Sequence, residues 1–425
     1  MMIQFHLCRI VVCLGALGIG TGSLPPVSAL SQETKFITEY RLDRETVDVP
    51  FEYVNHLILI KAQINDRKDL TFIFDTGAST LVLEKSLGIT GTHIADTQFR
   101  EAEGMTKAEA VWIDRVSMGA VGSAAQVRNV STLLTDLAQM SKILERPLGG
   151  IIGMTCMAGY TVEIDYEKKR LRFLPSRLYT VTTRKPDNKS TFLFDLKPVG
   201  DKDKISTHTV TGFLHPEYDQ EFLVDSGYAG YLTIGGIAAQ TAGILKTTTP
   251  RISSFAYSVS RKFQTLKIRT PFLKVGELDL KGKIISIDYR NDDAFGQFGI
   301  MGNRLLQNFR VTLDFQRKKL WLERTVEKEK EEQDEAEHLS LGITIRTDGT
   351  TVVLETVPPN SPASKLGLRP GDRLLAIDGV TLDRLTTPQI ANLLANPKKE
   401  TRLRCVDKFG TEHEATVPAS SPLDW

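Results

Sequence analysis

The chain of 425 residues contains two copies of one sequence pattern, and this repeat constrains its fold more than any other feature. Each copy places three apolar residues before an Asp-Thr/Ser-Gly tripeptide, at 72–77 in the first copy and 222–227 in the second. An apolar-apolar-Gly element follows, and its glycine lies 78 residues after the aspartate in one copy and 77 in the other. Because both copies keep the same elements at matching distances, we expect two lobes of similar structure.

The register between the copies continues beyond that glycine. Gly153 and Gly302 are each followed 12 residues later by an aspartate between an apolar and an aromatic residue, Asp165 in the first copy and Asp314 in the second. A basic run that ends in leucine comes next in both copies. The two copies are therefore predicted to share their order of strands.

Both copies are rich in short runs of aliphatic, β-branched and aromatic residues, which predict β-strands. In the first copy, the runs 57–60 and 70–74 flank a polar turn and predict a hairpin whose second strand ends at the aspartate. Helical patterns are scarce before the C-terminal region, and the best candidate is 132–144. We therefore predict a mainly β fold with two lobes, 30–180 and 190–325.

These motifs resemble those of the aspartic endopeptidases, in particular single-chain relatives with two retropepsin-like or pepsin-like halves. In that family each lobe is a β-barrel that presents one aspartate at a tight turn, and the two turns meet in one active-site cleft. The resemblance implies that Asp75 and Asp225 are the catalytic pair. It implies supporting roles for the other residues of the two loops, namely Thr76, Gly77, Ser226 and Gly227.

The chemistry of two adjacent aspartates agrees with this resemblance. Two carboxylates a few Å apart cannot both ionise without strong repulsion, so they share one proton. The ionised member can remove a proton from water, and the protonated member can hydrogen-bond to the peptide carbonyl oxygen. This hydrolysis needs no metal, no cofactor and no covalent intermediate, and we expect none.

Two residues depart from the family pattern. Ala78 lacks the hydroxyl that pepsin-like enzymes often place after the first motif, so the pKa of Asp75 should rise and activity should occur at milder acidity. Tyr228 stands where a small residue is usual, and it could either narrow the cleft or turn aside into the lobe. The alternative function, which Tyr228 favours, is a catalytically silent peptide- or protein-binding scaffold that retains the protease fold.

A flap is also expected, because enzymes of this kind close a β-hairpin over the substrate to exclude water. The best candidate is the segment 99–111, with its turn near Gly104, although an ordinary surface hairpin fits the same pattern.

The first 29 residues have the features of a signal peptide. Arg9 precedes an apolar run over 10–20, and the small residues at 27–29 provide a cleavage pattern that ends at Ala29. The run is too short to span a membrane, and no later apolar stretch approaches 18 residues. We expect an exported protein, periplasmic or secreted, that has no stable membrane span once the signal is cleaved.

The composition excludes several classes of protein. The 53 Lys and Arg residues balance 52 Asp and Glu residues, which argues against nucleic acid as a partner. Four cysteines are too few for a disulfide scaffold, and signal cleavage would leave Cys156 and Cys405 in different domains, where we expect buried, unpaired thiols. The seven histidines form no His-Glu-x-x-His pattern, so a metal-dependent hydrolase is not predicted.

The residues after the second lobe change character twice. Residues 326–338 are predicted to be an acidic linker, since seven acidic and two basic residues lie between Glu327 and Glu337. Residues 339–420 resemble a PDZ domain, and the run 359–380 carries the match. In such domains a bound peptide adds a strand to the sheet.

The PDZ resemblance implies a binding site for a peptide's terminal carboxylate at three backbone amides, those of Leu341, Gly342 and Ile343. A PDZ fold that packs on the protease lobes without binding any tail is the alternative. Taken together, the sequence predicts a monomeric, exported aspartic endopeptidase acting on polypeptides. Its PDZ domain would bind the C-terminal tails of substrates or regulators.

Overall fold

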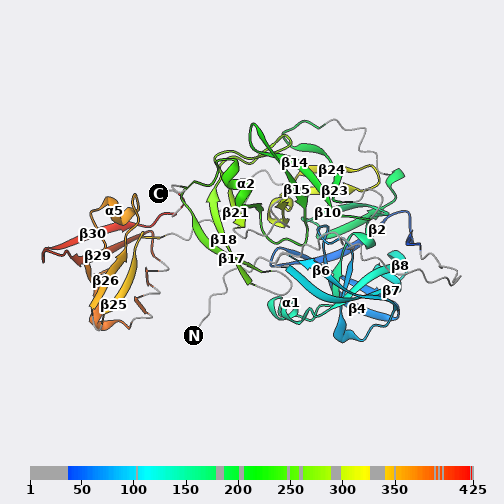
Figure 1. The fold of residues 1–425 in the computed structure, drawn as a ribbon, viewed down its shortest axis with the longest axis horizontal. Coiled ribbons are helices and arrows are strands. Elements are labelled where there is room, and N and C mark those ends of the chain that lie inside the picture. Colours follow the sequence, from blue (N-terminus) through cyan, green and yellow to red (C-terminus); the bar gives the residue numbers. More distant parts are fainter. Residues whose placement is uncertain are drawn as a thin grey trace, which may run out of the picture. The chain divides into compact units, whose positions relative to one another are not determined.

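The structure is a computed structural model, and it describes residues 37–101, 104–178, 186–200, 205–246, 249–257, 262–288, 298–325, 340–348, 351–386, 389–390, 393–394, 397–421 and 423. It divides into two units, Met1–Lys246 with Ser253–Leu266 and Thr270–Lys328, and Thr247–Ile252 with Lys267–Arg269 and Glu329–Trp425. Strands dominate both units, so the predicted mainly β class is confirmed (Figure 1).

Lobe 1, coloured blue to blue-green in Figure 1, is built from the first copy of the repeat. Its elements are β1 (Glu39–Leu42), β2 (Val47–Val54), β3 (Leu57–Ile64), β4 (Arg67–Phe74), β5 (Leu81–Glu84), η1 (Lys85–Leu87), β6 (Thr92–Glu101), β7 (Gly104–Ala120), β8 (Ser123–Thr135), α1 (Ala138–Ile143), β9 (Gly150–Ile152), η2 (Met154–Cys156), β10 (Thr161–Asp165), β11 (Arg170–Leu174) and η3 (Ser176–Leu178). The predicted hairpin is present as the antiparallel pair β3 and β4. At its tight turn, Asn65 adopts a positive φ of 49°.

Lobe 2, green to yellow in Figure 1, is built from the second copy. Its elements are β12 (Thr191–Asp195), β13 (Lys197–Pro198), β14 (His208–His215), β15 (Tyr218–Val224), β16 (Leu232–Gly235), α2 (Gly236–Thr241), β17 (Ile252–Tyr257), β18 (Lys262–Arg269), β19 (Lys274–Val275), β20 (Leu278–Asp279), β21 (Ile284–Asp288), β22 (Phe298–Met301), α3 (Asn303–Leu306), β23 (Phe309–Asp314) and β24 (Lys319–Arg324).

The same three-strand arrangement surrounds the motif in both lobes. In lobe 1, β9 pairs in parallel with β4 and antiparallel with β5. In lobe 2, β22 pairs in parallel with β15 and antiparallel with β16. The apolar-apolar-Gly elements are thus central strands with buried side chains on both faces, and each one passes directly beside the strand that ends at an aspartate.

The two lobes are joined through a run of six adjacent strands within a larger sheet, in the order β12-β24-β23-β10-β11-β2, and each lobe contributes three of the six. Its central pair is β10 of lobe 1 with β23 of lobe 2, which run antiparallel with Ile164 opposite Val311. Both strands bury aliphatic side chains, including Val162 and Leu313. This continuous sheet fixes the lobes to each other, so the two aspartate loops can meet in a defined geometry.

The helix expected over 132–144 is a partial error. Only Ala138–Ile143 is helical, as α1. Thr132–Thr135 belongs to β8 and pairs in parallel with Leu81–Glu84. Sheet pairing with a buried neighbouring strand therefore overrides the local helical pattern at these four residues.

The C-terminal part of the second unit, orange to red in Figure 1, has its own hydrophobic core and sheet. Its elements are β25 (Thr344–Asp348), β26 (Thr351–Thr356), α5 (Pro362–Lys365), β27 (Arg373–Ile377), β28 (Val380–Thr381), η5 (Leu382–Arg384), β29 (Glu400–Val406) and β30 (Glu412–Pro418). The main strand order is β25-β26-β27-β29-β30, which leaves β25 at an edge.

Several predictions fall on residues that the structure does not describe. The signal peptide at 1–29 and the acidic linker at 326–338 lie outside the described residues. Within the described ranges, no helix is long and apolar enough to cross a membrane.

Candidate active site

The fold places the two motif aspartates at equivalent positions. Asp75 directly follows β4, and its N–H donates to the carbonyl of Ile152 on β9 at 2.9 Å. Asp225 directly follows β15, and its N–H donates to the carbonyl of Met301 on β22 at 3.0 Å. Each apolar-apolar-Gly strand therefore holds the backbone from which one aspartate projects.

The structure brings the two carboxyl groups together across the lobe interface. A Cβ built on Gly77 would lie 2.4 Å from Cγ of Asp225, and one built on Gly227 would lie 2.2 Å from Cγ of Asp75. Real side chains cannot approach so closely, so only glycine allows each loop to pass beneath the opposite carboxyl group.

Thr76 and Ser226 tie the two loops together beneath the carboxyl groups. The N–H of Thr76 donates to Oγ of Ser226, and the N–H of Ser226 donates to Oγ1 of Thr76, both at 3.0 Å. The hydroxyls then donate across the interface, from Thr76 to the carbonyl of Val224 at 2.7 Å and from Ser226 to that of Phe74 at 2.9 Å. These four bonds fix the two loops symmetrically.

Both carboxyl groups are fully buried, at 0% exposure. Oδ1 of Asp75 accepts the N–H of Gly77 at 2.7 Å and that of Ala78 at 3.1 Å, which favours the charged form. Burial and the neighbouring carboxyl group of Asp225 outweigh these bonds and hold the pKa of Asp75 well above its ordinary value. The site therefore retains a proton that an isolated aspartate would lose.

Tyr228 does not narrow the space between the carboxyl groups. Its side chain is 1% exposed, and its ring lies over Gly230 and Gly302 within lobe 2, where a Cβ on either glycine would overlap it. Its hydroxyl forms a hydrogen bond of 2.5 Å with Thr233 on β16. Of the two orientations that the sequence left open, the structure adopts the one turned aside into the lobe.

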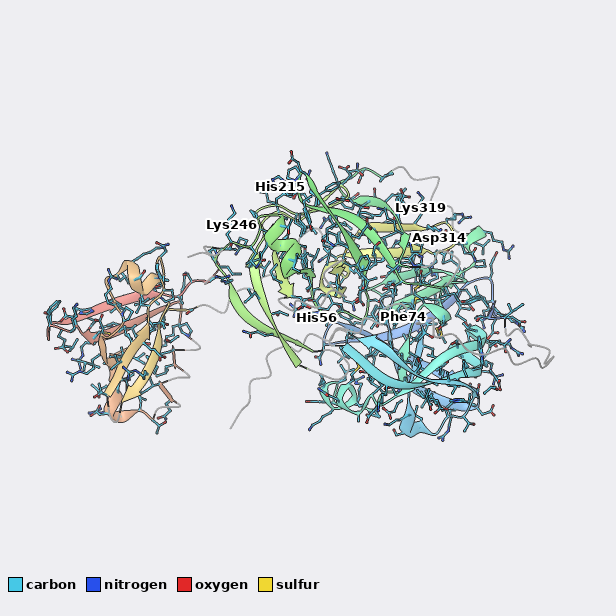
Figure 2. The ribbon with its side chains drawn as sticks, viewed as in Figure 1. His56, Phe74, His215, Lys246, Asp314 and Lys319 are labelled. Carbon is cyan, nitrogen blue, oxygen red and sulfur yellow. The ribbon has the colours of Figure 1, made fainter. Side chains whose placement is uncertain are left out.

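A buried amide at the lobe interface was not anticipated. Asn303, the first residue of α3, donates from Nδ2 to the carbonyl of Ser226 at 2.6 Å and to that of His56 at 2.8 Å. Its Oδ1 accepts the hydroxyl of Tyr166 at 2.6 Å. His56 and Phe74, labelled in Figure 2, lie on the side of lobe 1 that faces lobe 2.

The repeat itself held a signal for Asn303. The equivalent residue in lobe 1, directly after the glycine of the apolar-apolar-Gly element, is Met154. A buried polar residue that replaces an apolar one in an otherwise matching repeat needs hydrogen-bond partners, and here the other lobe supplies two of the three.

The flap candidate is part of a long antiparallel hairpin formed by β6 and β7, with Glu101 opposite Gly104. Residues 102–103, at its turn, lie outside the described residues. A cavity of about 1080 Å³ opens beside the hairpin. Its lining includes positively and negatively charged side chains, among them Lys85, Lys107 and Glu109.

Other candidate chemistry is limited. Cys156 and Cys405 are free and buried, as expected, and burial raises the pKa of both thiols to about 12. In the part of the chain that the structure describes, no group of three or more His, Cys, Asp or Glu side chains could hold a metal ion.

The predicted carboxylate-binding loop of the second unit lies just before the edge strand β25. Leu341 is buried, Gly342 has a positive φ of 72°, and Ile343 packs partly against the core. The N–H of Gly342 already donates to Oγ of Ser340 at 3.1 Å. A peptide carboxylate would therefore compete with that hydroxyl for one of the three predicted amides.

Two separate parts of the chain match known domain families. Residues 60–156 match the aspartyl protease family, and residues 353–407 match the PDZ domain family. Among characterised proteins, the chain is similar to the Regulator of sigma-E protease RseP of Escherichia coli (strain K12). The two are 39% identical over 84 residues, which cover 20% of this chain and 18% of RseP.

Two solved structures are also similar over a short part of the chain. One is a photosystem II D1 C-terminal processing protease, with 21% identity, a TM-score of 0.18 and coverage of 20% of this chain and 23% of that one. The other is a PDZ domain protein from Parabacteroides distasonis, with 20% identity, a TM-score of 0.18 and coverage of 19% and 20%. The chain spans about a fifth of the length of each of these proteins.

Proposed function

We propose that the protein is an aspartic endopeptidase that hydrolyses peptide bonds with Asp75, Asp225 and an activated water. The observation that carries this proposal is the reciprocal approach of each carboxyl group to the opposite glycine, where a Cβ would lie only 2.4 and 2.2 Å from the carboxyl carbons. Two fully buried carboxyl groups at such short range share a proton, which supplies a general acid and a general base in one site.

The reaction follows from that shared proton. The ionised carboxylate takes a proton from water as the water oxygen attacks the carbonyl carbon of the substrate. The protonated carboxyl donates to the carbonyl oxygen, which becomes a hydroxyl of the tetrahedral intermediate. As the C–N bond breaks, the leaving nitrogen takes the proton that came from water, and one hydroxyl of the intermediate returns its proton to the other carboxylate, so the dyad again holds one proton.

The remaining elements provide roles for a polypeptide substrate. The hairpin of β6 and β7 is proposed as the flap that excludes water from the reacting groups. The PDZ domain is proposed to bind C-terminal tails of substrates or regulators along its edge strand β25. Localisation outside the cytoplasm, in the periplasm or after secretion, is proposed from the signal-like sequence of residues 1–29.

A catalytically silent scaffold was the alternative, and Tyr228 was the residue that favoured it. With the Tyr228 ring packed over Gly230 and its hydroxyl bonded to Thr233, this residue no longer argues against catalysis. The retention of both aspartates in one buried pair favours an active enzyme.

The test is cleavage of an unfolded protein by the full chain over pH 3–8, compared with the Asp225→Asn variant. We expect cleavage by the wild type with a maximum above about pH 4, because the pKa of Asp75 is raised. Cleavage that persists unchanged in Asp225→Asn would exclude the dyad.

A further inference from the structure

Each aspartate accepts the N–H of the glycine in its own loop, but the surroundings of the two loops differ. In lobe 2, Asn303 Nδ2 donates to the carbonyl oxygen of Ser226 at 2.6 Å. The N–H of Gly227 belongs to that same peptide group, and it donates to Oδ1 of Asp225 at 2.8 Å. Asn303 in turn accepts the Tyr166 hydroxyl at 2.6 Å. An unbroken chain of hydrogen bonds therefore runs from Tyr166 to the carboxyl group of Asp225.

Each link of this chain polarises the next in the same direction. A donor at the carbonyl oxygen of a peptide group makes its N–H a stronger donor, and such effects accumulate in a low-dielectric interior. Asn303 is fully buried, and all three of its hydrogen-bonding groups are used: both amide protons and the oxygen. If the Asn303 amide were flipped, its Oδ1 would face the carbonyl oxygens of Ser226 and His56. The hydrogen bonds therefore fix the Asn303 amide as a donor toward Ser226.

The residues at the equivalent positions beside Asp75 cannot form these hydrogen bonds. Met154 occupies the position equivalent to Asn303, and its thioether cannot donate a hydrogen bond to the carbonyl of Thr76. At the position equivalent to Tyr166, lobe 2 has Phe315, which has no hydroxyl. Both hydrogen bonds therefore lead to the Asp225 loop, and the equivalent residues beside the Asp75 loop, Met154 and Phe315, cannot form them.

We propose that Tyr166 and Asn303 are positioning residues that make the dyad asymmetric, so that Asp225 is the ionised member that activates water and Asp75 is the protonated member. The inference rests on the proposed function for its catalytic meaning. Burial and the facing carboxyl group raise the pKa of Asp75, and the two N–H donors to Asp75 act in the opposite direction.

Several other titratable groups lie near these hydrogen bonds. Asp225 faces Asp75. Asn303 faces Tyr53, Tyr166 and His56 of lobe 1, with Tyr53 donating from its hydroxyl to the Asn303 carbonyl at 3.5 Å and His56 contributing its own carbonyl. Burial raises the pKa of Tyr166 well above its ordinary value, so Tyr166 keeps its proton as a donor throughout the acidic range. On lobe 2, Tyr228 follows Gly227 in the sequence and Arg304 follows Asn303.

The test is an NMR titration of aspartate carboxyl groups in the full-length protein, labelled with 13C-aspartate. It uses the Asp75→Asn background, because there Asp225 titrates without its partner carboxyl group. The double variant Asp75→Asn/Asp225→Asn identifies the Asp225 resonance, because that signal is missing from its spectrum. The chain's own repeat offers the matched substitutions, Asn303→Met and Tyr166→Phe. We expect the pKa of Asp225 to rise by about half a unit in Asn303→Met and by about 0.3 units in Tyr166→Phe.

Two further measurements complete the test. Met154→Leu changes the residue equivalent to Asn303 and is examined in the Asp225→Asn background. It should leave the pKa of Asp75 unchanged, because Met154 donates no hydrogen bond to the Asp75 loop. In the otherwise wild-type enzyme, Asn303→Met should move the acidic limb of the pH–rate profile upward by a similar amount. If Asn303→Met does not fold, Tyr166→Phe decides, because it removes one hydroxyl only.

An unshifted Asp225 titration in a folded variant would overturn the inference, even if activity fell. A wild-type enzyme without any cleavage would overturn the proposed function instead, and the titration would still decide whether the chain polarises Asp225.

Discussion

Thr76 and Ser226 exchange hydrogen bonds across the lobe interface, each donating its N–H to the hydroxyl oxygen of the other at 3.0 Å. The two residues are 150 positions apart in the sequence and both are buried. Their exchange makes the two aspartate loops one structural unit. The spacing of the carboxyl groups is therefore set by bonds between the lobes as well as by each lobe alone.

Removing one hydroxyl from this exchange should affect stability and activity together. Thr76→Val preserves shape but leaves the Ser226 N–H and the Val224 carbonyl without their partner. We expect a loss of about 2–4 kcal/mol in the free energy of unfolding. We also expect at least a tenfold loss of cleavage rate, measured by urea unfolding and a peptide assay. Thr76→Ser retains the hydroxyl and should stay within about twofold of the wild type; equal losses in both variants would contradict this account.

Stability should depend on pH through Asp75. Its pKa is raised in the folded state, so the native protein binds this proton more tightly than the unfolded chain does. The contribution of Asp75 therefore favours folding at low pH and is lost as the pH rises through the raised value. Asp75→Asn removes the cost of keeping this carboxyl group protonated in the folded state, so it should raise Tm at pH 7 by about 2–4 °C and have little effect near pH 4. A scan of Tm against pH, with the exposed Asp69→Asn as control, would refute the idea if Asp75→Asn lowered Tm at pH 7.

Tyr228 should contribute to the packing of lobe 2 and not to catalysis. Tyr228→Phe removes the 2.5 Å hydrogen bond to Thr233 and should reduce the free energy of unfolding by about 1–2 kcal/mol. The cleavage rate should stay within about twofold, because the ring remains over Gly230 and Gly302. Tyr228→Ala opens a cavity and should cost about 3–5 kcal/mol. A large loss of kcat in Tyr228→Phe at full stability would place the hydroxyl in the active site.

The PDZ loop should distinguish free from blocked peptide ends. A peptide with a free C-terminal carboxylate should bind the full chain at least about tenfold more tightly than its amide, as measured by fluorescence anisotropy. Ser340→Ala frees the Gly342 N–H, so it should tighten binding of the free acid and leave the amide unchanged. Equal affinity for both peptides would favour a PDZ fold that binds no tail.

The sequence predicted the parts of the site that lie within one copy of the repeat. Asp75 and Asp225 stand out because each ends an apolar strand run and recurs at a matching distance from a glycine. The fold class followed from the same runs. Residues that act through local geometry can be found from spacing, since the strand, the turn and the glycine are all encoded within a few positions.

The remaining features depend on contacts between distant segments. Asn303 and Tyr166 are 137 residues apart, and only the antiparallel pairing of β10 with β23 brings their neighbourhoods together. The direction of the Tyr228 side chain depends on space left by Gly230 and Gly302. Likewise, Thr132–Thr135 becomes a strand because β5 lies beside it. None of these outcomes is determined by local propensity.

In the proposed mechanism, both buried aspartates are needed for one hydrolytic step. The most direct measurement compares the initial rate of peptide cleavage by the wild type with the rates of three variants at the wild type's optimal pH: Asp75→Asn, Asp225→Asn and the exposed control Asp69→Asn. We expect Asp69→Asn to retain the full rate and each of the other two variants to lose about 10³-fold or more. A rate above about a tenth of the wild type in either dyad variant would contradict the proposed mechanism.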